Sequence, residues 1–264
     1  MKSIEFVMKN NLEKILVIIG DDKSNIRVSE NIIKYLNSIN KNNEYHFFIS
    51  DNSKNLKKLI KKNIIKKNFI ELEKNLKVNE YDWLINIWSS VIFKREFLSK
   101  FNNNLNLHPS YLPYNKGKDP YCWSIFNETP IGVSIHEMNE KIDAGKIYLR
   151  KKILVLFPYS AYQIYNRSLE EIKDLFIKNW LKIKAKKIKA RSINIKTPLN
   201  LRKHYYKHNF IDLNKKTREN KIIKKFILNI LSCDFNRINS LQIKLKNRIF
   251  DTKISLKKKN KRYF

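Results

Sequence analysis

The sequence predicts an α/β fold, in which a Rossmann-like, mostly parallel sheet is flanked by helices and followed by a small C-terminal α+β unit. Short β-branched runs without polar alternation are typical of strands buried on both faces of a parallel sheet. Amphipathic segments with apolar residues at helical spacing lie between these runs. The composition changes after Thr197-Pro198. We therefore expect a domain over residues 1–198 and a small helix and β-hairpin unit over residues 199–264.

The first half of the chain alternates strand-like and helix-like segments. The run that begins at Lys14 is almost wholly β-branched and ends at Gly20, as expected for a first buried strand. The next segment places Val28, Ile32 and Leu36 on one helical stripe. The predicted strands are Lys14–Gly20, Tyr45–Ser50, Tyr81–Trp88 and Asn104–Leu107, and the predicted helices are Ser24–Leu36, Leu56–Ile65 and Lys94–Phe101.

The second half begins with two extended segments, Gly132–His136 and Ile147–Leu156, joined by a turn-prone loop over residues 139–145. A long amphipathic helix then follows over Ala161–Lys184, where large apolar residues recur every three or four positions. Beyond residue 200 we expect one further helix and a pair of short strands. These are predicted at Asn220–Leu231 and within Leu241–Leu256, around a turn at Lys246-Asn247.

The formal net charge of +31 would attract phosphates on RNA, membranes or nucleotides. The lysines accompany heavy Asn and Ile usage, however, and a compositional bias of the genome produces the same excess. Cys122 and Cys233 are far apart, so neither a disulfide framework nor a zinc site is expected. Neither a membrane-spanning run nor a signal-peptide pattern is recognisable, and we expect a cytoplasmic protein that does not bind membranes.

Polar residues with catalytic chemistry follow the predicted strands. Asn106 and His108 stand at the carboxyl end of one strand, next to the segment 88–90 that follows another, and open α/β sheets bind ligands at this edge. An amide can donate to an oxyanion, while an imidazole can accept a proton or, once protonated, stabilise the same oxyanion. The carboxylate of Asp143 could orient that imidazole. His136 alternates with apolar neighbours on a strand, which favours a structural role.

These segments resemble the catalytic domain of folate-dependent formyltransferases over about residues 14–185. The similarity lies in the run 106–113, Gly117, the strand 132–136 and the run 142–145. The resemblance implies transfer of a formyl group from 10-formyltetrahydrofolate to a primary amine without a metal, with Asn106, His108 and Asp143 as catalytic residues. It also implies a folate cleft lined by Ile87, Trp88, Ser89, Val91, Ile92, Met138, Asn139 and Ile142.

The segments 81–85, 112–114 and 205–212 are most similar to nucleotide-sugar N-formyltransferases. The expected substrate is therefore a nucleoside diphosphate linked to an amino-deoxy sugar, and the expected partners are this nucleotide sugar and folate. A homodimer is one option for the assembly. The residues expected at this substrate are Tyr114, Lys116, Gly117, Lys118 and Trp123. Residues 116–118 form either a basic lip for the anion or a solvated turn, and Trp123 could instead fill the core.

Other functions remain open at this stage. Methionyl-tRNA formylation would suit the positive charge, although few residues remain for the β-barrel that such enzymes carry. A non-catalytic nucleic-acid-binding relative, or a deformylase that uses water in place of an amine, is also compatible with these residues. The loop after Gly20 lacks a dinucleotide-binding fingerprint, which argues against a nicotinamide enzyme.

Overall fold

A computed structural model describes residues 12–20, 26–39, 43–49, 56, 60, 63–65, 68–89, 91–155, 160–201, 217–233, 242–245 and 248–251. The chain divides into two compact units, Met1–Arg202 and Lys203–Phe264. The sequence analysis placed this boundary at residue 198. The two units are described separately below.

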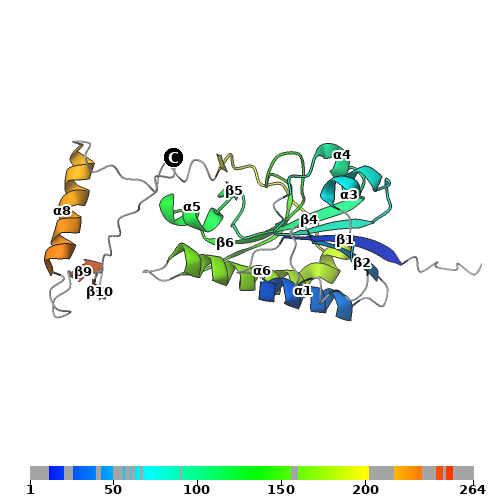
Figure 1. The fold of residues 1–264 in the computed structure, drawn as a ribbon, viewed down its shortest axis with the longest axis horizontal. Coiled ribbons are helices and arrows are strands. Elements are labelled where there is room, and N and C mark those ends of the chain that lie inside the picture. The colour runs from blue at the N-terminus through cyan, green and yellow to red at the C-terminus, as the bar shows by residue number, and fades with distance from the viewer. Residues whose placement is uncertain are drawn as a thin grey trace, which may run out of the picture. The chain divides into compact units, whose positions relative to one another are not determined.

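A six-stranded sheet forms the centre of the first unit, in the order β2-β1-β3-β4-β6-β7 (Figure 1). The first four of these strands are parallel, whereas β6 and β7 run antiparallel to their neighbours. This mostly parallel sheet confirms the predicted fold class. The strands are β1 (Glu13–Ile19), β2 (Asn43–Ile49), β3 (Trp83–Ile87), β4 (Asn103–His108), β6 (Gly132–His136) and β7 (Ile147–Lys152).

Helices cover both faces of this sheet, which explains why β1 is apolar along most of its length. Ile15, Val17 and Ile19 pack on the face covered by α1 (Ile26–Ser38) and α6 (Ala161–Lys184). The alternate residues Leu16 and Ile18 pack in the cluster on the other face, with α3 (Phe69–Asn75) and α4 (Arg95–Leu98). Figure 1 shows α1 and α6 together on one side of the sheet and α3 and α4 on the other.

The helix α6 has the predicted bounds because its first turn is capped. Ser160 accepts a hydrogen bond from the Gln163 backbone, and the Gln163 side chain accepts one from the Ser160 backbone. Near the other end of α6, Trp180 is fully buried, donates to the Tyr45 hydroxyl at 3.0 Å and packs edge-on against Trp83. This helix therefore anchors the sheet.

Several predicted elements differ from the observed ones. The helix expected at Leu56–Ile65 does not include residues 63–65, because Ile64 pairs with Phe47 in a parallel bridge; most of the remaining residues of this segment lie outside the described ones. The helix expected at Lys94–Phe101 is reduced to the single turn of α4, and the strand expected to reach Leu156 ends at Lys152. The sequence analysis also missed α3, α5 (Pro120–Phe126), and the short parallel pair β5 (Lys116–Gly117) and β8 (Leu199–Asn200).

The second unit contains α8 (Arg218–Cys233) and an antiparallel pair formed by β9 (Gln242–Leu245) and β10 (Arg248–Asp251). These elements match the predicted helix and strands, although the turn at residues 246–247 lies outside the described residues. In the part of the chain that the structure describes, no helix combines the length and apolar character needed to cross a bilayer.

Trp180→Ala should lower the free energy of unfolding by about 3–5 kcal/mol, because it removes a large, fully buried side chain and opens a cavity. The neighbouring Leu181 is 46% exposed, so Leu181→Ala should cost less than about 1 kcal/mol. Urea unfolding of both variants measures the difference. Equal losses would contradict the placement of Trp180 in the core.

Candidate active site

A cleft of about 390 Å³ opens beyond the carboxyl ends of β3 and β4, and we call it the main cleft. Asn106 and His108 reach it from the end of β4, and Asp143 reaches it from the loop between β6 and β7. The sheet edge and this loop thus bring together the three polar residues that the sequence singles out. The other lining residues used below are Asn86, Trp88, Ser89, Val91, Ile92, Gly117, Lys118, His136, Met138, Asn139 and Ile142.

Three buried polar side chains form a line across neighbouring strands at the floor of the main cleft. In the sheet register Asn86 pairs with Asn106, and Asn106 pairs with His136. The Asn86 amide donates to Asn106 Oδ1 at 2.9 Å, and Asn106 Nδ2 lies 3.0 Å from His136 Nε2. The other ring nitrogen of His136 lies 2.7 Å from the Glu137 carbonyl. This carbonyl can only accept, so His136 carries its proton on Nδ1 and accepts from Asn106 through Nε2.

His108 lies beside Asp143, with 3.7 Å between its Nδ1 and the Asp143 Oδ2. Burial lowers the pKa of His108 below its ordinary value, while the charge of Asp143 acts in the opposite direction. The imidazole is therefore neutral near pH 7. With Nδ1 turned toward the carboxylate, the proton belongs on Nδ1 and a lone pair remains on Nε2.

Asp143 is buried, yet its environment favours the ionised form. Burial alone would raise its pKa, but the His108 imidazole, whose Nδ1 faces the carboxylate, and the backbone N–H of Gly117 outweigh burial and hold the pKa well below its usual range. The Gly117 N–H donates to Oδ2 at 2.8 Å, and His136 Nε2 lies 3.5 Å from Oδ1. A fixed negative charge thus lies next to a neutral imidazole.

Three buried polar atoms of cleft-lining residues have no hydrogen-bond partner among the described residues. These atoms are His108 Nε2, Asn86 Oδ1 and the indole nitrogen of Trp88. Buried polar groups in proteins are normally paired, and groups left unpaired in a cleft are commonly satisfied by a ligand. The main cleft therefore has the character of a binding site for a molecule with both donors and acceptors.

Unusual backbone conformations hold two of the cleft residues. Trp88 and Asp143 adopt left-handed φ angles of 55° and 50°, a conformation that is uncommon for residues other than glycine and especially for a bulky residue such as Trp88. Two glycines allow the surrounding chain to approach closely. A Cβ on Gly20 would lie 2.2 Å from the Trp88 carbonyl oxygen, and one on Gly145 would lie 1.8 Å from the Glu137 carbonyl oxygen. Both loops of the cleft are consequently fixed by close backbone packing.

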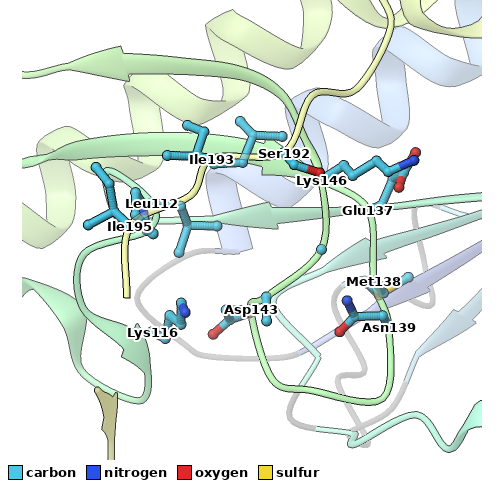
Figure 2. Close-up of a pocket in the computed structure, with 14 residues that line it drawn as sticks. Leu112, Lys116, Glu137, Met138, Asn139, Asp143, Lys146, Ser192, Ile193 and Ile195 are labelled. Carbon is cyan, nitrogen blue, oxygen red and sulfur yellow. The ribbon is translucent and has the colours of Figure 1, made fainter. Parts of the chain in front are cut away.

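A second hollow of about 320 Å³, here called the side cavity, adjoins the main cleft at Asp143. Figure 2 shows Asp143 and Lys116 facing a strip of chain that carries Ile193 and Ile195. Met138, Asn139 and Asp143 line both hollows. The loop that carries Asp143 therefore forms a wall shared by the main cleft and the side cavity.

The structure brings most, but not all, of the predicted site residues to these hollows. Of the residues expected at folate, only Ile87 does not line the main cleft, since it is fully buried within β3. Gly117 and Lys118 line the main cleft, and Lys116 lines the side cavity. Tyr114 and Trp123 line neither hollow, and Trp123 is buried in α5, where it packs edge-on against Phe126. For Trp123 the structure thus favours the core alternative.

The sequence analysis missed two members of the site. Asn86 is a polar residue inside an otherwise apolar strand, and that interruption is the signal that could have identified it. His136 was assigned a structural role because it alternates with apolar residues. Its ring instead contacts both Asn106 and Asp143, because β6 pairs directly with β4.

A cluster of three or more His, Cys, Asp or Glu residues able to hold a metal ion is not found within the described residues. The polar groups around His108 in the main cleft are instead the amides of Asn86 and Asn106, the imidazole of His136 and the carboxylate of Asp143. These can donate, accept and move protons around a reacting carbonyl.

Known proteins resemble the chain in sequence and in fold. The signature of the formyl transferase family matches residues 66–179. A dTDP-4-amino-4,6-dideoxyglucose formyltransferase of Mycobacterium bovis is 29% identical over 112 residues, which is 42% of this chain and 48% of that protein. The chain thus matches about half the length of this curated relative.

Two solved structures share the fold. A 4-N formyltransferase from Francisella tularensis superimposes with a TM-score of 0.69 at 22% identity, covering 94% of this chain and 99% of that one. The formyltransferase PseJ from Anoxybacillus kamchatkensis, solved with UDP-4,6-dideoxy-4-formamido-L-AltNAc and tetrahydrofolate, has a TM-score of 0.56 at 25% identity and covers 74% and 89%. These similarities confirm the resemblance found in the sequence.

The pKa of His108 should lie below about 6.5, the value for an unperturbed imidazole, because burial disfavours its charged form. Asp143→Asn should lower this pKa further, since the substitution removes the charge that stabilises the imidazolium. An NMR titration that follows the His108 ring carbon, assigned by its loss in His108→Asn, measures both values. A midpoint above 6.5, or a rise in Asp143→Asn, would contradict the described geometry.

Proposed function

The chain carries a formyl transferase domain most like those of nucleotide-sugar N-formyltransferases, and we propose that it moves a formyl group from 10-formyltetrahydrofolate to the primary amine of a nucleotide-linked amino-deoxy sugar. The observation that carries this proposal is the convergence of Asn106, His108 and Asp143 on one cleft. His108 lines that cleft, and its Nε2 has no hydrogen-bond partner among the described residues.

The amine attacks the formyl carbon, which places negative charge on the formyl oxygen and positive charge on the new C–N nitrogen. Asn106 uses one N–H on His136, and its second N–H is available to the developing oxyanion. Such a donor stabilises the transition state more than the ground state, because the oxygen charge is larger there.

His108 accepts the proton that the attacking nitrogen loses. Its Nε2 carries the lone pair, and the imidazolium that forms lies beside the ionised Asp143. The neutral ring in this structure supports the role of base over that of a pre-protonated oxyanion holder. When the tetrahedral intermediate breaks down, the proton passes to N10 of the folate, giving the formamide and tetrahydrofolate.

The main cleft suits the flat ring of a folate. Val91, Ile92, Met138 and Ile142 supply apolar surface, while the indole N–H of Trp88, which has no partner among the described residues, supplies a donor. The folate contacts inferred from the sequence are proposed here, except for the side chain of Ile87. The solved relative with bound tetrahydrofolate supports this assignment.

The basic residues at the edge of the two hollows suit a diphosphate. Lys118 lines the main cleft and Lys116 the side cavity, on either side of the Gly117 N–H that binds Asp143. We assign these lysines to the nucleotide sugar, whose negative charge they would attract. A relative named for a dTDP-linked amino sugar, and PseJ, which was solved with a UDP-linked formamido sugar, support this substrate class.

Incubation with 10-formyltetrahydrofolate and a panel of nucleotide-linked amino sugars should give a product that is heavier by about 28 Da, because CO is added. Mass spectrometry measures the gain. The positive charge also suggests methionyl-tRNA as a substrate, so methionyl-tRNA is tested in the same assay over a range of salt concentrations. Formylation of tRNA alone would overturn the assignment to sugars, and formate release without any amine would indicate a deformylase.

Asn106→Ala should lower kcat about 10²- to 10³-fold, because it removes the donor to the oxyanion. Asn179→Ala is the matched control, since it removes an asparagine whose amide donates to the Leu175 carbonyl within α6. Steady-state kinetics on the sugar identified above measure both variants. A kcat unchanged in Asn106→Ala would exclude the proposed role.

A further inference from the structure

Asn86 is buried at 5% exposure between two fully buried isoleucines of β3. A buried amide has a desolvation cost that an aliphatic residue at this position would avoid. Its Nδ2 donates to Asn106, but its Oδ1 has no partner among the described residues. Among the described residues, the hydrogen bond to Asn106 is therefore the side-chain contact that explains a buried amide at this position.

The direction of the hydrogen bonds across the three strands follows from one carbonyl group. The Glu137 carbonyl requires a donor, which places the His136 proton on Nδ1 and makes Nε2 an acceptor. Asn106 must then turn its Nδ2 toward His136, so its Oδ1 faces Asn86. A donor is needed at this position, and the Asn86 amide supplies it.

We propose that Asn86 is a positioning residue, which holds the Asn106 carboxamide in the orientation that directs its free N–H into the main cleft. This inference rests on the proposed formyl transfer and adds a residue to it. The side chain acts through Asn106 and transfers no proton itself. Two hydrogen bonds from opposite sides, one to Oδ1 and one from Nδ2, oppose rotation of the carboxamide about its Cβ–Cγ bond.

The absence of Asn86 would leave Asn106 Oδ1 buried without a donor. The carboxamide could then turn its oxygen toward the main cleft, where it would face the developing oxyanion with like charge. Because an interaction made only in the transition state would be lost, Asn86→Leu should lower kcat and leave KM unchanged. A purely structural role of Asn86 in β3 would not lower kcat selectively.

The kinetic test compares Asn86→Leu with Asn103→Leu. Asn103 lies at the start of β4, away from the main cleft, and its amide donates to the Asp82 carbonyl. Asn103→Leu is therefore a matched control, because it also removes a hydrogen-bonded side-chain amide from the same sheet. Asn86→Leu should lower kcat about 10- to 100-fold with KM for both substrates nearly unchanged. Asn103→Leu should leave kcat unchanged. A loss in both variants, or a loss confined to KM, would overturn the proposal.

A double-mutant cycle tests whether Asn86 acts through Asn106. In the Asn106→Ala background, Asn86→Leu should have no further effect on kcat, because there is no carboxamide left to orient. A loss of equal size in both backgrounds would mean that Asn86 acts on the ligands directly, and would overturn the proposal.

NMR of the Asn106 side-chain amide gives a readout that does not depend on activity. Its two N–H signals, assigned by their absence in Asn106→Ala, should be sharp and distinct in the wild-type protein and in Asn103→Leu, and should shift or broaden in Asn86→Leu. Unchanged signals in Asn86→Leu would overturn the positioning role even in an active enzyme. Altered signals in a protein that formylates no sugar would refute the proposed function and leave the positioning role intact.

Discussion

The site depends on keeping one ionised carboxylate in a buried place. An isolated buried carboxylate would be neutralised by a raised pKa, so the charge of Asp143 requires nearby donors. The Gly117 backbone N–H supplies one such bond, and Nδ1 of His108 lies 3.7 Å from the same carboxylate oxygen. The same arrangement fixes the ring of His108 and ties the 137–146 loop to β5. The main cleft and the side cavity share this wall.

Sheet register then determines which groups meet. The parallel register of β3 and β4 sets Asn86 against Asn106, and the antiparallel register of β4 and β6 sets Asn106 against His136. Residues that pair directly across neighbouring strands place their side chains on the same face. Three side chains that are distant in sequence therefore form one row of hydrogen bonds. The Glu137 carbonyl determines which group in this row donates and which accepts.

The sequence predicts the elements that have strong hydrophobic periodicity. It does not predict the elements whose conformation depends on pairing with residues that are distant in the chain. The apolar runs and the capped amphipathic helix α6 were predicted closely, because burial on both faces or on one stripe is visible in the residue order. The segment 63–65 was misassigned because its pairing with Phe47 depends on distant residues. The role of Asn86 was not visible for the same reason, since register is a property of the folded sheet. The proposed catalytic residues were inferred from motif spacing and from family resemblance.

The reversal of strand direction at β6 explains why this sheet can hold both an amide and an acid–base pair. In a wholly parallel sheet the strand next to β4 would present its carboxyl end at the same edge as His108, and a long crossover would be needed to return. Here β6 runs the other way, and the 137–146 loop to β7 brings Asp143 back over that edge. The carboxylate thus approaches His108 from a loop whose closure depends on Gly145, while Asn106, the proposed oxyanion donor, stays on a strand of the sheet. In the proposed reaction, the amide that must keep a fixed orientation is thus carried by the sheet, and the charge that balances the transferred proton is carried by the loop.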